Sequence, residues 1–356
     1  MGINESFWRD KKVLITGHTG FKGSWLALWL QQMKAHVYGF ALAPPTQPNL
    51  FEKANVGQCI ASHIGDIRDL SALKSVFLKT EPDIVIHLAA QPLVRYAYQN
   101  PVETYQTNVI GTLHVLEAIR ACPSVRAAVI VTTDKCYDNK EWIWAYRENE
   151  PLGGYDPYSS SKACAELLIA SYRNSFFSDA HSPAIASARA GNVIGGGDWS
   201  PDRLVPDIIQ AFQANQTLSI RNPNAIRPWQ HVLDSLSGYL LLAEKLFTEG
   251  QHYAEPWNFG PDMNDMQPVQ SIVQHLATYW PQANWTIEEQ TQFHEARSLK
   301  LDSTKAHERL DWHPRWRLSD ALQLTAEWYQ AESQGLDMGL FCRKQIQLFT
   351  NQRGAG

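Results

Sequence analysis

Short apolar runs alternate with longer helical patterns through the first half of the chain. Runs that predict buried strands lie at 12–16, 35–42, 83–90 and 127–135, and a further predicted strand ends in the segment 63–69. Between them, apolar residues spaced three and four positions apart predict helices at 24–30, from about Leu70, at 101–122 and at 157–172. Because strand and helix alternate, the pattern predicts an α/β fold with a Rossmann-type doubly wound parallel sheet.

The pattern changes after Ser187. Residues 189–199 are rich in glycine and look too irregular for a helix or strand. Beyond them, the pattern predicts helices at 233–248, 267–280, 302–310 and 319–334, a strand at 257–260 and a surface tail from Arg343. We therefore expect a smaller C-terminal α/β lobe. The expected division gives the sheet domain residues 1–188 and 229–258, and the lobe residues 189–228 and 259–356.

A glycine-rich turn joins the first strand to the first helix. Lys12–Thr16 runs directly into G-H-T-G-F-K-G at Gly17–Gly23, and an apolar helical segment follows. Glycines let the backbone turn tightly and approach a pyrophosphate, which then sits at the positive end of a helix. The spacing is G-x-x-G-x-x-G rather than G-x-G-x-x-G. Its place between an N-terminal strand and a helix nevertheless predicts a dinucleotide-binding turn.

The end of the second strand usually shows which dinucleotide is bound. An Asp or Glu there binds the adenosine ribose, whereas an Arg accommodates a 2′-phosphate. Tyr38–Pro45 holds neither, so this segment leaves NAD and NADP open, with the absence of a cation mildly favouring NAD. After the third strand, Asp66 could accept a hydrogen bond from an adenine amino group, because Asp69 is better placed to cap the next helix.

A tyrosine and a lysine four residues apart are the main candidates for catalysis. Tyr158 and Lys162 would lie on one face of a helix that Pro157 can begin. A fixed ammonium beside a phenol favours the phenolate and would lower the pKa of the phenol from about 10 toward neutrality. Tyr158 could then remove a proton from an alcohol. Alone the pair is a weak motif, which an ordinary surface helix carries about as often.

Polar residues also follow the fifth strand, where ligands bind in an open parallel sheet. Thr133, Asp134 and Lys135 emerge at this edge, although for three polar residues alone the polarity of a loop is the favoured explanation.

Three arginines follow the glycine-rich segment within a short span. Arg203, Arg221 and Arg227 carry guanidinium groups, which suit bidentate contacts to phosphate oxygens. The alternative is solvated charge, and the aromatic setting R-P-W-Q-H makes that alternative weakest for Arg227.

Composition narrows the class of protein. The chain has 356 residues, of which 44% are hydrophobic and 19% charged, as expected for a compact enzyme. A net charge of −5 without a basic run argues against nucleic-acid binding. The five cysteines are scattered without a C-x-x-C or zinc spacing, so we expect no metal and a reducing cytoplasm. No apolar run is long enough to span a membrane, and no signal peptide is expected.

Together these motifs resemble the extended short-chain dehydrogenase/reductase family along almost the whole chain. The matching segments are T-G-x-x-G-F-x-G at Thr16–Gly23, G-D-I-R-D at Gly65–Asp69, L-A-A at Leu88–Ala90, Thr107–Thr112, the Tyr158/Lys162 pair and R-x-G-N at Arg189–Asn192. Within that family the chain is most similar to the sugar-nucleotide 4,6-dehydratases. This likeness rests on G-H-T-G-F-K-G-S-W-L from Gly17, A-A-Q-P-L-V-R from Ala89, T-T-D-K-C-Y-D-N from Thr132, G-G-Y-D-P-Y-S from Gly153 and I-R-P-W-Q-H-V from Ile226.

The resemblance implies NAD as the cofactor and CDP-glucose as the substrate. The residues expected to bind the cofactor are Gly17, Thr19, Gly20, Phe21, Lys22, Gly23, Asp66, Ile67, Leu88, Ala89, Ala90 and Thr107, with Tyr158 and Lys162. The residues expected to bind the nucleotide diphosphate are Asn192, Arg203, Arg221 and Arg227, with Arg297 as a further candidate.

The resemblance also implies a reaction cycle. Tyr158, steadied by Lys162, would take the proton of the sugar C4 hydroxyl while the hydride passes to nicotinamide, and Thr133 would hydrogen-bond the same hydroxyl. Asp134 would protonate the hydroxyl that leaves C6, and the hydride would return to C6. Related dehydratases have a glutamate where this chain has Lys135. The C5 base therefore stays open, because Lys135 could either take that proton or stabilise an enolate.

Two rival functions use the same motifs. A nucleotide-sugar 4-epimerase would also need Tyr158 and NAD, but it needs no chemistry from Asp134 and Lys135. A regulatory protein that binds NAD without turnover would need neither Thr133 nor the Tyr158/Lys162 pair. The complete set of motifs favours the dehydratase over both.

Family members commonly pair through the helix that bears the tyrosine and lysine and through the helix at 101–122. The resemblance thus implies a homodimer or homotetramer. It also implies a role in deoxysugar biosynthesis, including that of lipopolysaccharide O-antigen.

Overall fold

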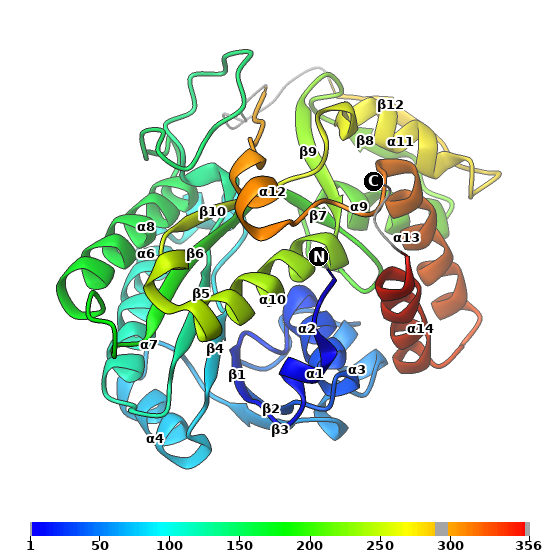
Figure 1. Cartoon of the computed structure of the whole chain (residues 1–356). Helices are drawn as coiled ribbons and strands as arrows, with labels where there is room; N and C mark the ends of the chain where they lie inside the picture. The colour runs from blue at the N-terminus through cyan, green and yellow to red at the C-terminus, as the bar shows by residue number, and fades with distance from the viewer. Residues whose placement is uncertain (1, 289–297, 353–356) are drawn as a thin grey trace.

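A seven-stranded parallel sheet forms the centre of the computed structural model, which describes residues 2–288 and 298–352 (Figure 1). Its strands, in the order β3–β2–β1–β4–β5–β6–β10, pair in parallel throughout. They are β1 (Lys12–Thr16), β2 (His36–Ala41), β3 (Ala61–Ile64), β4 (Ile84–His87), β5 (Ala127–Val131), β6 (Ala184–Ala190) and β10 (Pro256–Phe259). The predicted doubly wound sheet is confirmed. The direction of winding reverses between β1 and β4, where ligands bind in folds of this kind.

Both faces of the sheet are covered, which explains why its strands read as continuous apolar runs. Val13 and Ile15 pack into the core beneath α2 (Phe21–Gln32) and α10 (Val232–Glu249). Leu14, between them, belongs to the core on the opposite face. There the sheet is covered by α4 (Leu70–Thr80), α7 (Gly111–Arg120) and α8 (Pro157–Phe176) (Figure 1). The first strand therefore anchors helices on both sides of the sheet.

The helix expected at 101–122 contains an irregular turn. The chain forms α6 (Pro101–Tyr105), then a π-helical turn at Gln106–Ile110, and then α7. Such π turns often occur at functional sites. Thr107 lies within this turn.

Two small sheets build the lobe. One has the order β11–β9–β7 and the other pairs β12 with β8. These strands are β7 (Asn192–Ile194), β8 (Leu218–Ile220), β9 (Ile226–His231), β11 (Met266–Pro268) and β12 (Trp285–Ile287). The larger helices here are α9 (Leu204–Gln213), α11 (Val269–Ala277), α12 (Thr304–Leu310) and α13 (Leu318–Ser333). The prediction that 189–199 holds no regular element was wrong, because β6 ends at Ala190 and β7 follows almost at once.

The predicted surface tail was also wrong. Residues from Asp337 onward form α14 (Met338–Asn351), capped by the Asp337 carboxylate. One face of α14 buries Cys342, Ile346 and Phe349, and the Phe349 ring meets Trp29 of α2 edge-on. Polar residues between these apolar positions hide the helical spacing in the sequence.

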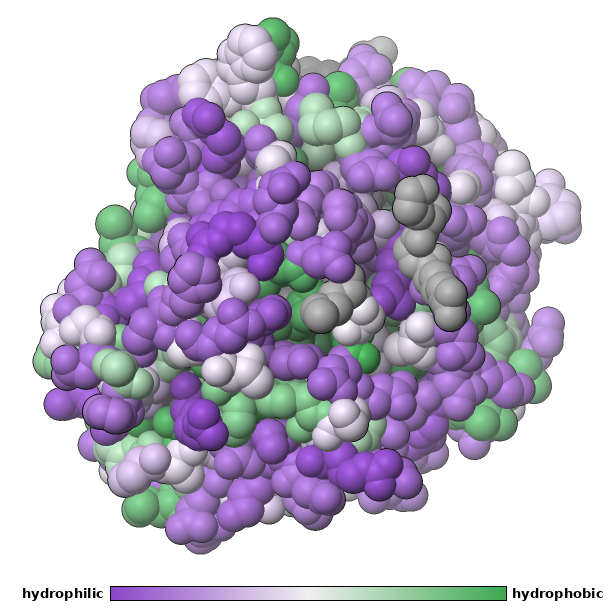
Figure 2. Space-filling view, in the orientation of Figure 1, coloured by the Kyte–Doolittle hydropathy of each residue, from purple (hydrophilic) through white to green (hydrophobic). Residues whose placement is uncertain are grey.

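The remaining elements are short. They are α1 (Glu5–Trp8), α3 (Leu50–Lys53), α5 (Val94–Gln99) and single 3₁₀ turns at Val56–Gln58, Asp134–Cys136, Gly250–Tyr253 and Met263–Asp265. Among the described residues, no helix combines the length and apolar character needed to cross a membrane. The face in Figure 2 is predominantly hydrophilic, with hydrophobic residues in separate small patches.

Candidate active site

A cavity of about 1030 Å³ lies at the carboxyl ends of the central strands. The glycine turn, the ends of β4 and β5, the start of α8 and segments of the lobe surround it. The predicted residues that line it are Gly17, Thr19, Gly20, Phe21, Lys22, Gly23, Asp66, Ile67, Leu88, Ala89, Ala90, Thr107, Thr133, Lys135, Tyr158, Lys162, Asn192, Arg203, Arg221 and Arg227. Asp134 is fully buried behind the wall. Arg297 lies outside the described residues.

The glycine turn fits a dinucleotide pyrophosphate. Gly17 has a φ of +82°, and a Cβ there would lie 2.6 Å from the backbone nitrogen of Ala89. A Cβ on Gly23 would lie 2.1 Å from the carbonyl oxygen of Gly17. Gly20 is the N-cap of α2 and has no capping side chain. The first N–H groups of α2 therefore face the cavity wall without a side chain between them, as phosphate binding at a helix N-terminus requires.

The carboxylate expected to meet adenine already has a partner. Asp69 caps α4 by accepting a hydrogen bond from Ala72 N, as predicted. Asp66 was expected to have no partner within the protein, but it pairs with the guanidinium of Arg68 at 2.6 Å. That hydrogen bond holds the pKa of Asp66 below its usual value. Asp66 thus reaches the cavity as an ionised, anchored carboxylate.

Tyr158 and Lys162 lie on one face of α8, as predicted. Pro157 begins the helix, and the Asp156 side chain caps it by accepting from Ser159 N. Both side chains are almost entirely buried while lining the cavity. Burial lowers the pKa of Lys162 to about 8.

The expected lowering of the Tyr158 pKa does not occur. Burial raises it to about 12, the nearby carboxylate of Asp134 adds to the rise, and a hydrogen bond with Thr133 opposes it. Burial therefore outweighs the attraction of the Arg203 guanidinium, and Tyr158 rests in its neutral form.

The three polar residues after β5 form one cluster with Tyr158. The Thr133 hydroxyl donates to Asp134 Oδ1 at 3.0 Å, and Lys135 Nζ lies 3.6 Å from the same oxygen. Asp134 Oδ2 is buried without a hydrogen-bond partner. The cluster places a hydroxyl, a carboxylate, an ammonium and a phenol together, which suffices for proton transfer to and from a sugar.

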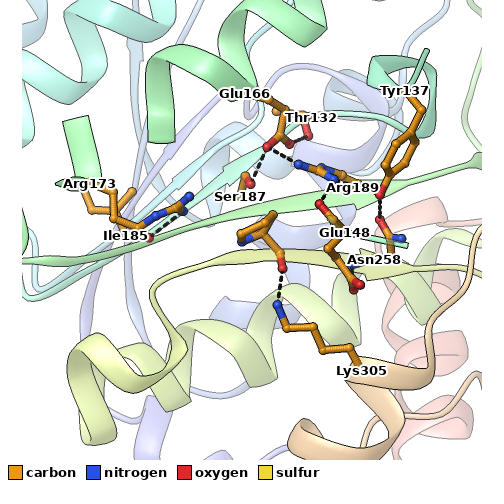
Figure 3. A network of polar contacts seen from close by, with 11 residues as sticks. Thr132, Tyr137, Glu148, Glu166, Arg173, Ile185, Ser187, Arg189, Asn258 and Lys305 are labelled. Atoms are coloured by element: carbon orange, nitrogen blue, oxygen red, sulfur yellow. Dashed lines mark hydrogen bonds and ion pairs between the residues drawn. The ribbon is translucent and has the colours of Figure 1, made fainter. Parts of the chain in front are cut away.

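A buried network behind the catalytic helix was missed in the sequence (Figure 3). Glu166, one turn after Lys162, accepts hydrogen bonds from Thr132, from Ser187 at 2.8 Å and from Arg189 at 2.8 Å. Burial alone would raise the pKa of Glu166, but Arg189 and the other donors hold it below its usual value. Two signals could have pointed to this pair: a glutamate four residues after the lysine, and an arginine within an apolar strand.

The network extends toward the lobe through Arg189. Its guanidinium also donates to the Tyr137 hydroxyl at 2.9 Å, and that hydroxyl donates to Asn258 on β10 at 2.7 Å (Figure 3). The network thus joins the start of the catalytic turn, the catalytic helix and the last strand of the sheet.

The arginines predicted to bind phosphate have internal counter-ions. Arg203 pairs with Asp198 at 2.8 Å. Asp202 lies 3.9 Å from Arg221 and 3.1 Å from Arg95 of α5. Neither aspartate nor Arg95 is predicted as a site residue from the sequence, because contacts between distant segments leave no local signal.

The other two predicted substrate residues also reach the cavity. Arg227, on β9, donates to the carbonyl oxygen of Ile226 at 3.0 Å. Asn192, on β7, leaves its buried Oδ1 without a hydrogen-bond partner. These side chains and the three paired arginines line the lobe end of the cavity.

Comparisons with known proteins agree with this geometry. The family model described as GDP-mannose 4,6 dehydratase matches residues 14–325. A protein of Salmonella typhimurium strain LT2, named CDP-glucose 4,6-dehydratase, is 53% identical over 347 residues, which cover 96% of each chain.

Two solved structures show the same fold at low sequence identity. A dTDP-glucose 4,6-dehydratase from Bacillus anthracis, in complex with NAD, has a TM-score of 0.76 and 22% identity, covering 92% of this chain and 98% of that one. A UDP-glucose 4-epimerase from Stenotrophomonas maltophila, with bound NAD, has a TM-score of 0.79 and 21% identity, covering 91% and 99%. At these identities, both establish the fold alone.

Proposed function

This chain belongs to the GDP-mannose 4,6-dehydratase family, and we propose that it acts on CDP-glucose. It converts CDP-glucose to CDP-4-keto-6-deoxyglucose with loss of one water. The observation that carries this conclusion is the near full-length similarity to a relative named CDP-glucose 4,6-dehydratase. The enzyme is therefore a lyase.

NAD, when bound, would supply a hydride acceptor for sugar C4 and a hydride donor for C6, so that the reaction has no net redox change. The turn at Gly17–Gly23 would hold its pyrophosphate at the N-terminus of α2. Leu88–Ala90 and Thr107 line the same wall of the cavity. We assign NAD binding to residues 1–188 and 229–258, and sugar-nucleotide binding to 189–228 and 259–356.

The first step requires a base at the C4 hydroxyl. Tyr158 Oη takes this proton, and the Thr133 hydroxyl, which bonds to Tyr158, orients the sugar oxygen. Because burial raises the pKa of Tyr158 to about 12, the phenolate forms only with electrostatic help. Arg203 supplies positive charge near it, and Lys162 lies one turn further along the same helix as Tyr158.

The second step removes water across C5 and C6. Asp134 donates a proton to the departing hydroxyl through a carboxyl group that the protein buries completely. Lys135 Nζ lies 3.6 Å from Asp134 Oδ1. We propose that its neutral amine takes the C5 proton as the C6–O bond breaks, so that the elimination loses one proton to Lys135 and gains one from Asp134.

A product assay tests the function. Purified protein is mixed with CDP-glucose, with and without added NAD, and the sugar nucleotide is followed by mass spectrometry. We expect loss of one water, and a Tyr158→Phe variant serves as the inactive control. An unchanged mass with a new C4 epimer would establish a 4-epimerase instead. Unchanged substrate, tested also with other nucleotide diphosphate sugars, would refute turnover altogether.

The helix surface supports a homodimer. Val102 on α6 is 69% exposed, Ile110 in the π turn 42% and Leu167 on α8 60%. The two helices pack against each other, so these apolar side chains lie on neighbouring elements that a second copy could cover. We propose a dimer through this surface, with a tetramer as a pair of dimers. Light scattering of a Leu167→Lys variant tests it, since a charge there should shift the mass toward the monomer.

The cysteines support a cytoplasmic location. All five are free thiols, as a reducing compartment requires. The proposed product is a deoxysugar nucleotide, so we propose a role in deoxysugar biosynthesis, including that of lipopolysaccharide O-antigen.

A further inference from the structure

Lys22 occupies an unusual position for a lysine. It lies in the first turn of α2, within the glycine turn, and its partly exposed surface forms part of the cavity wall. Its ammonium donates to the Tyr239 hydroxyl on α10 at 3.1 Å and lies 5.4 Å from the centre of that ring. Among the described residues, it forms no ion pair with a carboxylate. A cation is therefore held at the cavity wall by a phenol alone.

The surroundings of Lys22 are the groups of the reaction centre. Asp134 attracts its charge, whereas Lys162 on α8 and Arg203 before α9 repel it. Tyr239 is fully buried and interacts electrostatically with both Asp134 and Tyr158. The charged groups that act on Lys22 therefore belong to the catalytic cluster or lie next to it.

These surroundings change how readily Lys22 keeps its proton. Burial, followed by the repulsion from Arg203 and Lys162, lowers its pKa to about 7, and Asp134 opposes that shift. A cationic group that titrates near neutrality changes the charge of the cluster within the working pH range of an enzyme. Backbone binding of a pyrophosphate by the glycine turn requires no such side chain.

We propose that Lys22 and Tyr239 form a second lysine–tyrosine pair at the reaction centre, through which Lys22 controls the protonation of the cluster of Thr133, Asp134 and Tyr158. Lys22 is a positioning residue, because it acts through these groups. When it is charged, it favours negative charge on the phenol of Tyr158, which the first step requires. When it is neutral, that support is absent. This role deepens the proposed dehydratase function and rests on it.

Competitive labelling tests the titration without substrate or cofactor. The cofactor-free protein is acetylated with acetic anhydride across a pH series, and mass spectrometry measures the extent of labelling at each lysine. We expect Lys22 to reach half-maximal reactivity near pH 7. Lys79, exposed at the end of α4, serves as the control for the reactivity of a lysine in contact with water. Equal titration of the two lysines would overturn the proposal even if the enzyme is a dehydratase.

Kinetics of the NAD-loaded enzyme test the consequence. The charged fraction of a group with a pKa of about 7 falls about tenfold between pH 6 and 8. The ratio of wild-type to Lys22→Met activity should therefore fall as the pH rises, by at most about tenfold over that interval. Lys22→Arg, which stays charged, should follow the wild type at pH 6 and depart from it at pH 8. A merely structural role would lower the rates by a constant factor and leave the pH profiles parallel, which would refute the proposal.

A Tyr239→Phe variant tests whether Lys22 acts together with the Tyr239 hydroxyl or on its own. If the phenol acts by holding Lys22, the variant should move the pH profile, and adding it to Lys22→Met should change the rate less than twofold. Additive losses in the double variant would show that the two residues act independently. Lys79→Met provides the matched control and should behave like the wild type. Absence of dehydratase activity at every pH in the wild type would refute the proposed function, while the labelling result would still decide the state of Lys22.

Discussion

Replacing Glu166 by glutamine should destabilise the protein severely. The carboxylate accepts three hydrogen bonds, and its partner Arg189 is only 2% exposed. Glutamine keeps the shape of the side chain but removes its charge. It would leave the guanidinium buried without a counter-ion, and one of its amide hydrogens would face a donor (Figure 3).

The size of the loss follows from the burial of both partners. The Glu166 and Arg189 side chains are 2% and 3% exposed, so water screens neither. Removing one partner of such a pair costs about 3–5 kcal/mol. That is a large fraction of the roughly 5–15 kcal/mol that stabilises a folded protein. Replacing both residues, as in Glu166→Gln with Arg189→Met, should cost less than the single change, because no buried charge is then left unpaired.

Urea denaturation at neutral pH measures the loss as a difference in the free energy of unfolding. Glu249→Gln is the matched control, because it breaks the exposed pair with Lys245 and should cost less than about 1 kcal/mol. A loss for Glu166→Gln no larger than for this control would refute the reasoning.

The pH dependence of the loss gives a second check. The pKa of Glu166 is lower when folded, so its contribution is present above the unfolded value of about 4.3 and is lost as pH falls through the folded value. The gap between variant and wild type should therefore narrow in acid.

Three further predictions address the site. Lys135→Ala should abolish exchange of the C5 proton with solvent deuterium while hydride transfer stays detectable by absorbance, and full turnover would exclude a catalytic role. Gly17→Ala should weaken NAD binding at least tenfold in calorimetry, because its φ of +82° and its 2.6 Å approach to Ala89 leave no room for a methyl group; unchanged affinity would contradict the fit. Lys162→Met should raise the melting temperature at pH 7 while abolishing activity, because burying the ammonium costs stability below the folded pKa of about 8. That cost disappears as pH rises toward the unfolded ~10.4, so a stability difference that widens with pH would be the wrong sign.

Local sequence patterns predicted the sheet and much of the cavity wall. Parallel strands buried on both faces appear as apolar runs, and the polar or glycine residues that follow each run lie beside those that follow neighbouring strands. The positions of the glycine turn and Thr133 follow from this rule, and that of the Tyr158/Lys162 pair follows from helical spacing. Their spacing along the chain already fixes their place on the fold.

Local sequence patterns could not predict contacts between distant segments. Glu166 and Arg189 lie 23 residues apart, so each charge is visible locally but nothing in either segment shows that the two side chains pair. The pKa of Tyr158 was predicted in the wrong direction for the same reason. Four-residue spacing shows that a lysine is on the same face, but not how deeply both groups are buried. Burial decides the sign.

The charge distribution along the cavity explains how a phenol that rests in its neutral form can still give the phenolate that serves as the base. At the lobe end, Arg203 already has Asp198 as a counter-ion, so a bound diphosphate must compete with that carboxylate. At the reaction centre, Lys22 and Lys162 form no ion pair among the described residues, and both hold their protons less firmly than lysines in water. Both side chains are held in place before substrate binds, so the positive charge that they carry needs no rearrangement when the proton leaves Tyr158. The free energy lost by burying two lysines is then offset at the moment when negative charge develops on the phenol, and a site that paired them beforehand would lose this effect.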